Sequence, residues 1–561
     1  MKQFHKRLLA LLLIFAMIFA VAACGNDEQP QPTEEKTAIR IPEPVNTETC
    51  TEMGTPLADV RVRQALALAI DMDTIIEALY FGNAEAASGF AFGENEEATP
   101  YPYDPELAKE LLAEAGWPSD YVLDVVYYHQ DQQLEDMLKV IGSYWDAVGV
   151  KAEFRKLEGD LAAQLWTAPS DPDGDSAVSW DLLCGAVAAL TESEIYGKFA
   201  STATNNSHTP EIEGLDELIE QGEYDRVKQI LAENVSFIPL LHQNGYVYTS
   251  DHIDTGAAIH GNDQFAYGKD ILNWTTDRED NTLYTDGGPE SFFQYPLVNP
   301  GLYLYQELIF ERLLNADSDL NPTDGQIAES YTVSEDGKTV EFVIREDLIW
   351  HDGEPLTGED VKFTYELYMQ CPGANALLTD VLDQLEGAQA FLDGDTDECS
   401  GITVEENKVT FCFAQAEEDA LAVFSQWPIL PKHKLENVRP EKLQQDKFWK
   451  NPVGSGPYKV GTVELGDYCV LERWEDYRLT GEGNIEKIHM IASGETDGNL
   501  AAYAANGDID YAWGKSTDDA VYIQSLENMN VTEVQISYTR CFFINQYPHV
   551  SYHQQEETPT E

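Results

Sequence analysis

The residues that could do chemistry in this chain match none of the common hydrolase patterns. A hydrolase would need a G-x-S-x-G turn, an H-E-x-x-H helix, or a nucleophile beside its base, and the sequence contains none of them. The run DPDGDSAVSWD (171–181) resembles a calcium loop, but Gly174 is misplaced and position twelve is Leu182. A phosphate-binding loop is also absent. We therefore predict a protein that is not an enzyme, with no metal and no cofactor; a cell-surface hydrolase stays the rival class.

Cysteine spacing does not predict a metal site. The eight cysteines contain no C-x-x-C pair, which argues against structural zinc. Cys24 belongs to the leader described next, and the seven others leave at least one thiol free. Cys371–Cys399 is the first candidate for a disulfide.

The first residues predict export and lipidation. Lys2, Lys6 and Arg7 precede an apolar run that ends in VAAC at residues 21–24. This is the pattern of a bacterial lipoprotein signal peptide over residues 1–24, with Cys24 acylated and the protein lipid-anchored to the cell membrane outside the cytoplasm. An ordinary secretory signal is the alternative. Residues 25–54 begin with a run rich in Pro, Glu and Gln, and we expect them to be a flexible tether.

The charge balance excludes one class of partner. The formal net charge is −66, from 100 acidic and 34 basic residues. Such a surface repels nucleic acid phosphates, so nucleic acid is not an expected partner. With 43% hydrophobic residues the chain has enough apolar side chains for a folded core.

Local patterns predict α/β architecture. The run YDPELAKELLAEAGWP (103–118) has a helix cap at Asp104 and a helix stop at Gly116, and YVLDVVYY (121–128) reads as a strand. Residues 132–150 predict a second amphipathic helix, followed by another strand. In the second half, Asp336-Gly337 joins two alternating runs and predicts a hairpin. Alternating strands and helices favour an α/β fold.

Seven phrases together resemble the extracellular solute-binding protein family 5, the oligopeptide- and dipeptide-binding lipoproteins of ABC importers, with nickel-binding relatives. The resemblance covers most of residues 55–546 and implies a periplasmic-binding-protein-like fold (class II, type C), a two-lobed clamp with mixed sheets. The phrases are DVRVRQALALAID, YDPELAKELLAEAGWP, FIPLLHQNGYVY, AESYTVSEDGKTVEFVIREDLIWHDGEPLTGEDVKFTY, VGSGPYKV, LERWEDYR and AAYAANGDIDYAWG.

The order of the phrases differs from that of the family. Relatives begin with the hairpin phrase and reach DVRVRQAL late, whereas this chain begins near DVRVRQAL and ends near CFFINQYPHV. We therefore predict a circularly permuted fold, with a scrambled gene as the alternative. One crossover between the lobes, near Phe237–Tyr246, stays covalent, and the other would be rebuilt from the two chain ends. The expected domains are a smaller lobe at 55–235, a larger lobe at 236–546 with 254–290 joining the old termini, and a polar tail at 547–561.

The resemblance also implies where a ligand binds. An extended peptide would be held between the lobes, its backbone paired with exposed strands. The protein would act as a monomer and deliver the peptide to a membrane permease, with ATPase subunits supplying the energy. The implied ligand contacts lie on one loop of each lobe. The side chains of Trp427 and Trp513 would form walls of the pocket, and packing in the core is the alternative role for these aromatic residues. The implied contacts are Asn299, Gly301, Tyr303, Tyr305, Trp427, Trp513, Leu183, Cys184, Gly185 and Ala186.

One departure weakens the peptide interpretation. Relatives place an aspartate after the smaller-lobe strand to pair with the ligand's ammonium group, and CGAVAALTESEIYGKF has none there. Glu192 or Glu194 could substitute, with Glu192 the first candidate, and a solvated loop acid is the alternative. A nickel chelate or another small solute remains an alternative ligand, and a ligand sensor without transport an alternative function.

Overall fold

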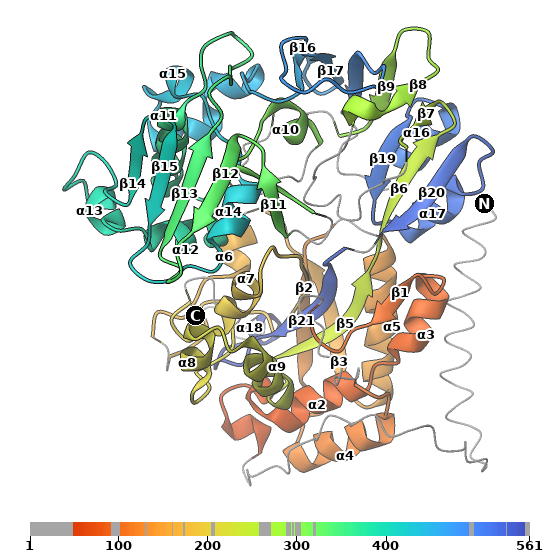
Figure 1. Ribbon diagram of the computed structural model, residues 1–561. Helices are drawn as coiled ribbons and strands as arrows, with labels where there is room; N and C mark the ends of the chain where they lie inside the picture. The colour runs from red at the N-terminus through yellow and green to blue at the C-terminus, as the bar shows by residue number, and fades with distance from the viewer. Residues whose placement is uncertain are drawn as a thin grey trace, which may run out of the picture. The chain divides into compact units, whose positions relative to one another are not determined.

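The computed structural model describes most of the chain in segments (Figure 1). No described helix is long and apolar enough to cross a membrane. The lipidation site Cys24 and the predicted leader lie outside the described residues. Those residues are 49–90, 101–129, 132–159, 161–171, 174–203, 208–256, 271–287, 293, 297, 304–317, 321–492, 499–534 and 536–555.

The chain divides into two compact units. Unit 1 contains the described residues up to Asn244 and from Ser537 onward, and unit 2 runs from Gly245 to Ile536. The chain thus passes between the units twice, at Asn244–Gly245 and at Ile536–Ser537. Both crossings are covalent, so the expectation that one would have to be rebuilt from the chain ends is wrong.

Unit 1 is built on a mixed six-stranded sheet in the order β1-β5-β21-β4-β2-β3. β2 runs parallel to β3 and β4, whereas β21 runs antiparallel to both β4 and β5. In Figure 1 the blue β21 accordingly lies among strands from the first half of the chain. The strands are β1 (Ala84–Ala86), β2 (Val122–Tyr127), β3 (Lys151–Lys156), β4 (Leu182–Val187), β5 (Phe237–Gln243) and β21 (Thr539–Ile544).

Helices cover both faces of this sheet. Strand residues alternate between two apolar clusters: Leu182 and Cys184 join one, and Leu183 joins the other. The first cluster includes side chains of α2–α5 and the second those of α7–α9, which makes a three-layer α/β unit. The helices are α2 (Val60–Leu68), α3 (Met72–Leu79), α4 (Pro105–Ala115), α5 (Gln132–Ala147), α6 (Leu161–Leu165), α7 (Glu192–Tyr196), α8 (Leu215–Glu220), α9 (Tyr224–Glu233) and α18 (Tyr552–Gln555).

The described residues of unit 2 form a seven-stranded sheet, a four-stranded sheet and two strand pairs. The large sheet has the order β16-β17-β18-β9-β19-β6-β20, and the smaller has β12-β13-β15-β14. β9 runs parallel to β18 and β19. The strands are β6 (Gly245–Ser250), β7 (Ile253–Asp254), β8 (Thr275–Thr276), β9 (Thr282–Thr285), β10 (Leu314–Ala316), β11 (Pro322–Gly325), β12 (Ala328–Val333), β13 (Thr339–Ile344), β14 (Ile402–Glu405), β15 (Lys408–Cys412), β16 (Tyr458–Glu464), β17 (Tyr468–Arg473), β18 (Lys487–Ile491), β19 (Tyr511–Gly514) and β20 (Met529–Val534).

Side-chain caps begin several helices of unit 2. Thr357 and Asp360 form a capping box at the start of α11. In the β12–β13 hairpin, Val340 and Phe342 are buried on one face, as the alternation predicts. The helices are α10 (Leu304–Ile309), α11 (Gly358–Met369), α12 (Ala376–Asp383), α13 (Ala388–Leu392), α14 (Ala420–Gln426), α15 (Lys432–Leu435), α16 (Asn499–Asn506) and α17 (Thr517–Ile523).

Two expected boundaries differ from the structure. The structural division places β5 and β21 in unit 1, because β21 pairs with both β4 and β5, whereas the predicted boundary at 235/236 placed them in the larger lobe. Residues 547–555 of the expected polar tail also pack into unit 1, where Tyr547 and Ser551 are buried.

The predicted disulfide is wrong. Cys371 and Cys399 are both buried, and neither is in a disulfide. Each thiol instead makes a weak hydrogen bond to a carbonyl: Cys371 Sγ to Pro440 O and Cys399 Sγ to Glu386 O, each at 3.7 Å. The five other described cysteines form no disulfide either.

Candidate ligand-binding site

Strand β4 carries the four smaller-lobe residues that the resemblance singled out. Leu183 and Cys184 are fully buried in the two apolar clusters, so only their backbone could meet a ligand. Gly185 and Ala186 follow, opposite Cys541 and Arg540 of β21. A Cβ on Gly185 would lie 3.5 Å from Phe543, which is an ordinary contact. The described protein atoms therefore leave room for a side chain at residue 185, so crowding by them does not explain the glycine.

The end of β4 has an unpaired edge. Pairing with β2 stops at Tyr127↔Cys184, whereas pairing with β21 continues to Val187. Among the described residues no strand pairs with Gly185–Val187 on the β2 side. In this unpaired edge Gly185 and Val187 are buried and Ala186 is half-buried. It lies at the carboxyl ends of the parallel strands β2 and β4, the end where open α/β sheets bind ligands. An extended backbone added here would continue the ladder.

Polar and aromatic side chains surround this part of the sheet. Arg540 is buried opposite Ala186, with its Nε 3.3 Å from Gln243 Oε1 and its guanidinium over the Tyr538 ring at 5.6 Å. Tyr128 follows β2, and burial raises the pKa of its hydroxyl well above its usual value. His242 Nδ1 lies 3.0 Å from Thr539 Oγ1. The site combines an open backbone edge with a buried positive charge.

Glu192, the candidate ammonium ligand, already has a cation. Its Oε1 lies 2.6 Å from Lys228 Nζ. Thr191 caps α7 through the backbone N–H of Glu194, which places Glu192 in the first turn of the helix. An ammonium group would have to compete with Lys228 for this carboxylate.

The larger-lobe candidates are only partly described. Asn299, Gly301 and Tyr303 lie outside the described residues. Tyr305 is buried in α10 with an edge-to-face contact to Phe293 at 5.1 Å.

The two tryptophan candidates differ in exposure. Trp427 is fully buried at the end of α14. Trp513 is half-buried in β19, with Lys515 Nζ 6.0 Å from the centre of its ring. Of the two, Trp513 has the more accessible ring.

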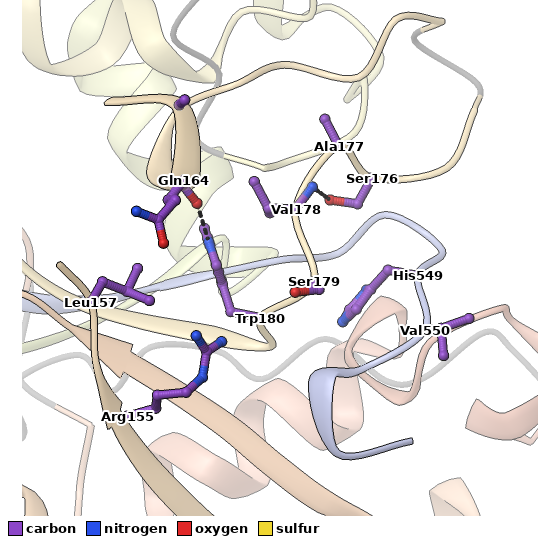
Figure 2. Close-up of a pocket in the computed structure, with 11 residues that line it drawn as sticks. Arg155, Leu157, Gln164, Ser176, Ala177, Val178, Ser179, Trp180, His549 and Val550 are labelled. Atoms are coloured by element: carbon purple, nitrogen blue, oxygen red, sulfur yellow. Dashed lines mark hydrogen bonds between the residues drawn. The ribbon is translucent and has the colours of Figure 1, made fainter. Parts of the chain in front are cut away.

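Unit 1 also contains a pocket of about 490 Å³, shown in Figure 2. Arg155 and Trp180 line it together with His549 and Val550 from the end of the chain. Three polar side chains of the wall have partners: Arg155 binds Asp124, His549 Nε2 lies 2.9 Å from Asp181 Oδ1, and Trp180 Nε1 donates to Gln164 O. No sequence pattern pointed to this pocket, because its walls come from segments more than 350 residues apart.

No metal centre is formed by the residues that the structure describes, since no three His, Cys, Asp or Glu side chains are grouped to hold an ion.

Comparison with known proteins identifies the family. The model of the bacterial extracellular solute-binding proteins, family 5, matches residues 32–182 and 323–556, which together are more than half of the chain. The protein belongs to this family, whose description places its members outside the cytoplasm.

Curated relatives match shorter parts of the chain. A putative ABC transporter peptide-binding protein of Brucella ovis is 27% identical over 237 residues, 42% of each chain. The heme-binding protein A of Haemophilus influenzae is 30% identical over 268 residues, 43% of this chain and 46% of that protein. The match therefore spans less than half the length of these relatives.

One similar solved structure is the oligopeptide-binding protein AppA of Bacillus subtilis in complex with a nonapeptide. It is 22% identical, with a TM-score of 0.36, over 44% of this chain and 46% of that one.

Proposed function

We propose that this protein is the peptide-binding component of an ABC importer and passes its ligand to a membrane permease served by ATPase subunits. The observation that carries the proposal is the open edge of β4 at Gly185–Val187, in a chain that belongs to a solute-binding family. Backbone pairing at such an edge gives affinity without demanding one side-chain sequence. The names of the Brucella and Bacillus proteins support a peptide as the ligand class.

Binding of a random tetrapeptide library tests this proposal. Native mass spectrometry of the purified protein should show one peptide bound per chain, with many sequences represented. The same library with N-methylated backbones is the control, because methylation removes the N–H groups that a β-ladder needs. Equal binding of both libraries would contradict backbone pairing. If the protein retained haem or a nickel chelate and no peptide, its ligand would be one of those solutes and not a peptide.

The permuted order is also part of the proposal. A Cβ on Gly54 would lie 2.9 Å from the Cβ of Pro548, so the segments that are continuous in the family's order lie side by side. This contact supports a rotated gene order with the unit 1 fold preserved.

Lipid anchoring at Cys24 and a monomeric state complete the proposal. The VAAC sequence supports acylation. Replacing Cys24 by alanine should release the protein from the membrane fraction, whereas replacing Cys50, which is buried in unit 1, should not. If the Cys24→Ala protein stayed in the membrane fraction, lipid anchoring at Cys24 would be contradicted.

A further inference from the structure

The pocket of Figure 2 is separate from the open edge of β4. Trp180, which lines the pocket, comes just before the first residue of β4, whereas the open edge at Gly185–Val187 is at the other end of that strand. The volume of about 490 Å³ is in the range of small-molecule sites. All its described walls belong to unit 1, so this one compact unit is enough to form it.

Two hydrogen-bond donors of the wall have no partner among the residues that the structure describes. Arg155 donates from Nε and Nη2 to the Asp124 carboxylate, at 3.2 and 2.5 Å, and its guanidinium lies 4.2 Å from the centre of the Tyr552 ring. These contacts fix the side chain and leave its Nη1 without a described acceptor. The hydroxyl of Ser179 also makes no described hydrogen bond. Figure 2 shows Arg155 extending toward Trp180, with Ser179 across the same space.

The wall carries no carboxylate among its described residues, although the chain has 100 acidic residues. The two buried acids that contact the wall already have cations. Asp124 pairs with Arg155, and Asp181 Oδ1 lies 2.9 Å from His549 Nε2. The two unused donors of the described wall therefore have no acid of the wall as a competitor. A ligand group that accepts hydrogen bonds and carries a negative charge matches them.

The rest of the wall is largely apolar. Leu157 and Val178 are buried, and Val550 is an exposed apolar side chain on the same wall. Trp180 already uses its Nε1 to donate to Gln164 O, so its ring offers the pocket an apolar surface. An apolar body attached to the anionic group would cover these side chains, whereas a bare inorganic anion would leave them in contact with water.

We propose that this pocket binds a small organic carboxylate. The carboxylate would accept from Arg155 Nη1 and from the Ser179 hydroxyl, and the apolar body of the ligand would lie against Trp180. This site goes beyond the proposed peptide function, because it uses neither the open edge of β4 nor unit 2.

The ligand would lie between the segment before β4 and the end of the chain. Two backbone hydrogen bonds already join these segments: Ser176 N–H donates to Pro548 O at 2.8 Å, and Tyr552 N–H donates to Ser179 O at 3.1 Å. A ligand held by both segments should therefore stabilise the docking of residues 547–555.

Titration calorimetry with 4-phenylbutanoate tests the site, and 4-phenylbutanamide, which has the same apolar body without the charge, is the matched ligand. The purified protein should bind the acid about tenfold more tightly than the amide. Arg155→Lys keeps a cation for Asp124 but loses the guanidinium fork, so it should remove most of this preference. Ser179→Ala should weaken binding of the acid by a smaller factor, about threefold.

Val550 allows a test that spares the core of unit 1. Its side chain is 57% exposed, so Val550→Asp and Val550→Lys should both fold. At low salt the aspartate variant should bind the acid about threefold more weakly than the wild type, and the lysine variant about threefold more tightly. Leu479→Asp, at a residue of unit 2 that is 55% exposed, is the matched control and should bind the acid as the wild type does.

Hydrogen exchange locates the bound acid, because 4-phenylbutanoate should slow exchange of the Ser176 and Tyr552 amides. Free tetrapeptides should not displace the acid. Displacement by free tetrapeptides, but not by C-terminally amidated ones, would show that the pocket holds the carboxyl end of a peptide and would overturn a separate site. Equal affinity for acid and amide, no binding of the acid, or an unchanged preference in Arg155→Lys would overturn the carboxylate site. Peptide binding, measured separately, decides the proposed function.

Discussion

Arg63 shows how much a single residue of the DVRVRQAL phrase contributes to unit 1. The guanidinium is buried and donates to four backbone carbonyls, those of Leu57, Ala58, Asn234 and Val235, at 2.7–3.1 Å. Burial lowers its pKa to about 10, so it stays charged at neutral pH. The arginine thereby ties the end of α9 to the start of α2. The phrase was recognised in the sequence as part of the family resemblance, but the role of the arginine depends on a carbonyl 171 residues away.

Replacing Arg63 by alanine should lower the free energy of unfolding by about 3 kcal/mol or more, because four buried or half-buried carbonyls lose their donor. Urea unfolding measures the change. Arg226→Ala is the control, since Arg226 is exposed on α9 and should change stability by less than about 0.5 kcal/mol. Equal effects of the two variants would contradict the role assigned to Arg63.

His549 predicts a pH dependence of stability. Burial alone would lower its pKa, but the hydrogen bond and the charge of Asp181 outweigh burial and raise the pKa above 6.5. Tyr121, Ser551 and the backbone N–H of Asp124 also donate to Asp181. Since the folded-state pKa is raised, the stabilisation is fully present below about pH 6.5 and is lost as the pH rises through the folded value.

The stability advantage of the wild type over His549→Gln should therefore be larger at pH 6 than at pH 9 in urea unfolding. His252→Gln, at a half-exposed histidine, serves as the control. An advantage that grows with pH would show that His549 is neutral in the folded protein.

At the scale of elements, the sequence predicted helix ends that depend on nearby residues. It did not predict which distant segments lie beside one another in a sheet. Asp104 caps α4 through the Leu107 N–H at 2.9 Å, and Gly116 ends it at φ +72°, as the sequence predicted. These signals act within one turn of the chain. The insertion of β21 between β4 and β5 depends on pairing between segments about 300 to 360 residues apart, which no local pattern encodes. The open edge of β4 was missed for the same reason, because it depends on where β2 ends.

The contact between Gly54 and Pro548 gives a prediction for the two segments that it joins. Gly54→Ala should destabilise unit 1 both through its φ of +81° and through the clash of the new Cβ with Pro548. Gly149→Ala is the matched control, because Gly149 has a φ of +90° but no atom within 4 Å of a new Cβ. Gly54→Ala should thus cost about 1–3 kcal/mol more than Gly149→Ala in thermal or urea unfolding. Equal losses would mean that residues 54 and 548 are not in contact.

At the scale of the whole molecule, the family and the α/β class followed from the sequence, and the unit boundaries did not. The predicted boundary at 235/236 followed the phrase order, whereas the structural boundary follows strand pairing. The expectation of a rebuilt crossover failed because the chain continues from β20 into β21 before it ends in unit 1.

A chain rewritten in the family's order, with residue 555 joined to residue 49 through a flexible Gly/Ser linker and new ends within 257–270, should fold and bind the same ligands. The linker costs little, because the entropy of loop closure rises only slowly with loop length. A chain opened instead inside α5, between Lys139 and Val140, is the control and should lose its cooperative unfolding transition. If the chain in the family's order failed to fold, the proposed circular permutation would be contradicted.

The central claim is that this chain captures peptides, and native mass spectrometry of the gently purified protein tests it most directly. The account predicts a folded ion that carries extra mass and releases peptides of mixed sequence on activation. A folded ion that releases only haem or a metal chelate, or that carries nothing and takes up no peptide when peptides are added, would contradict the claim.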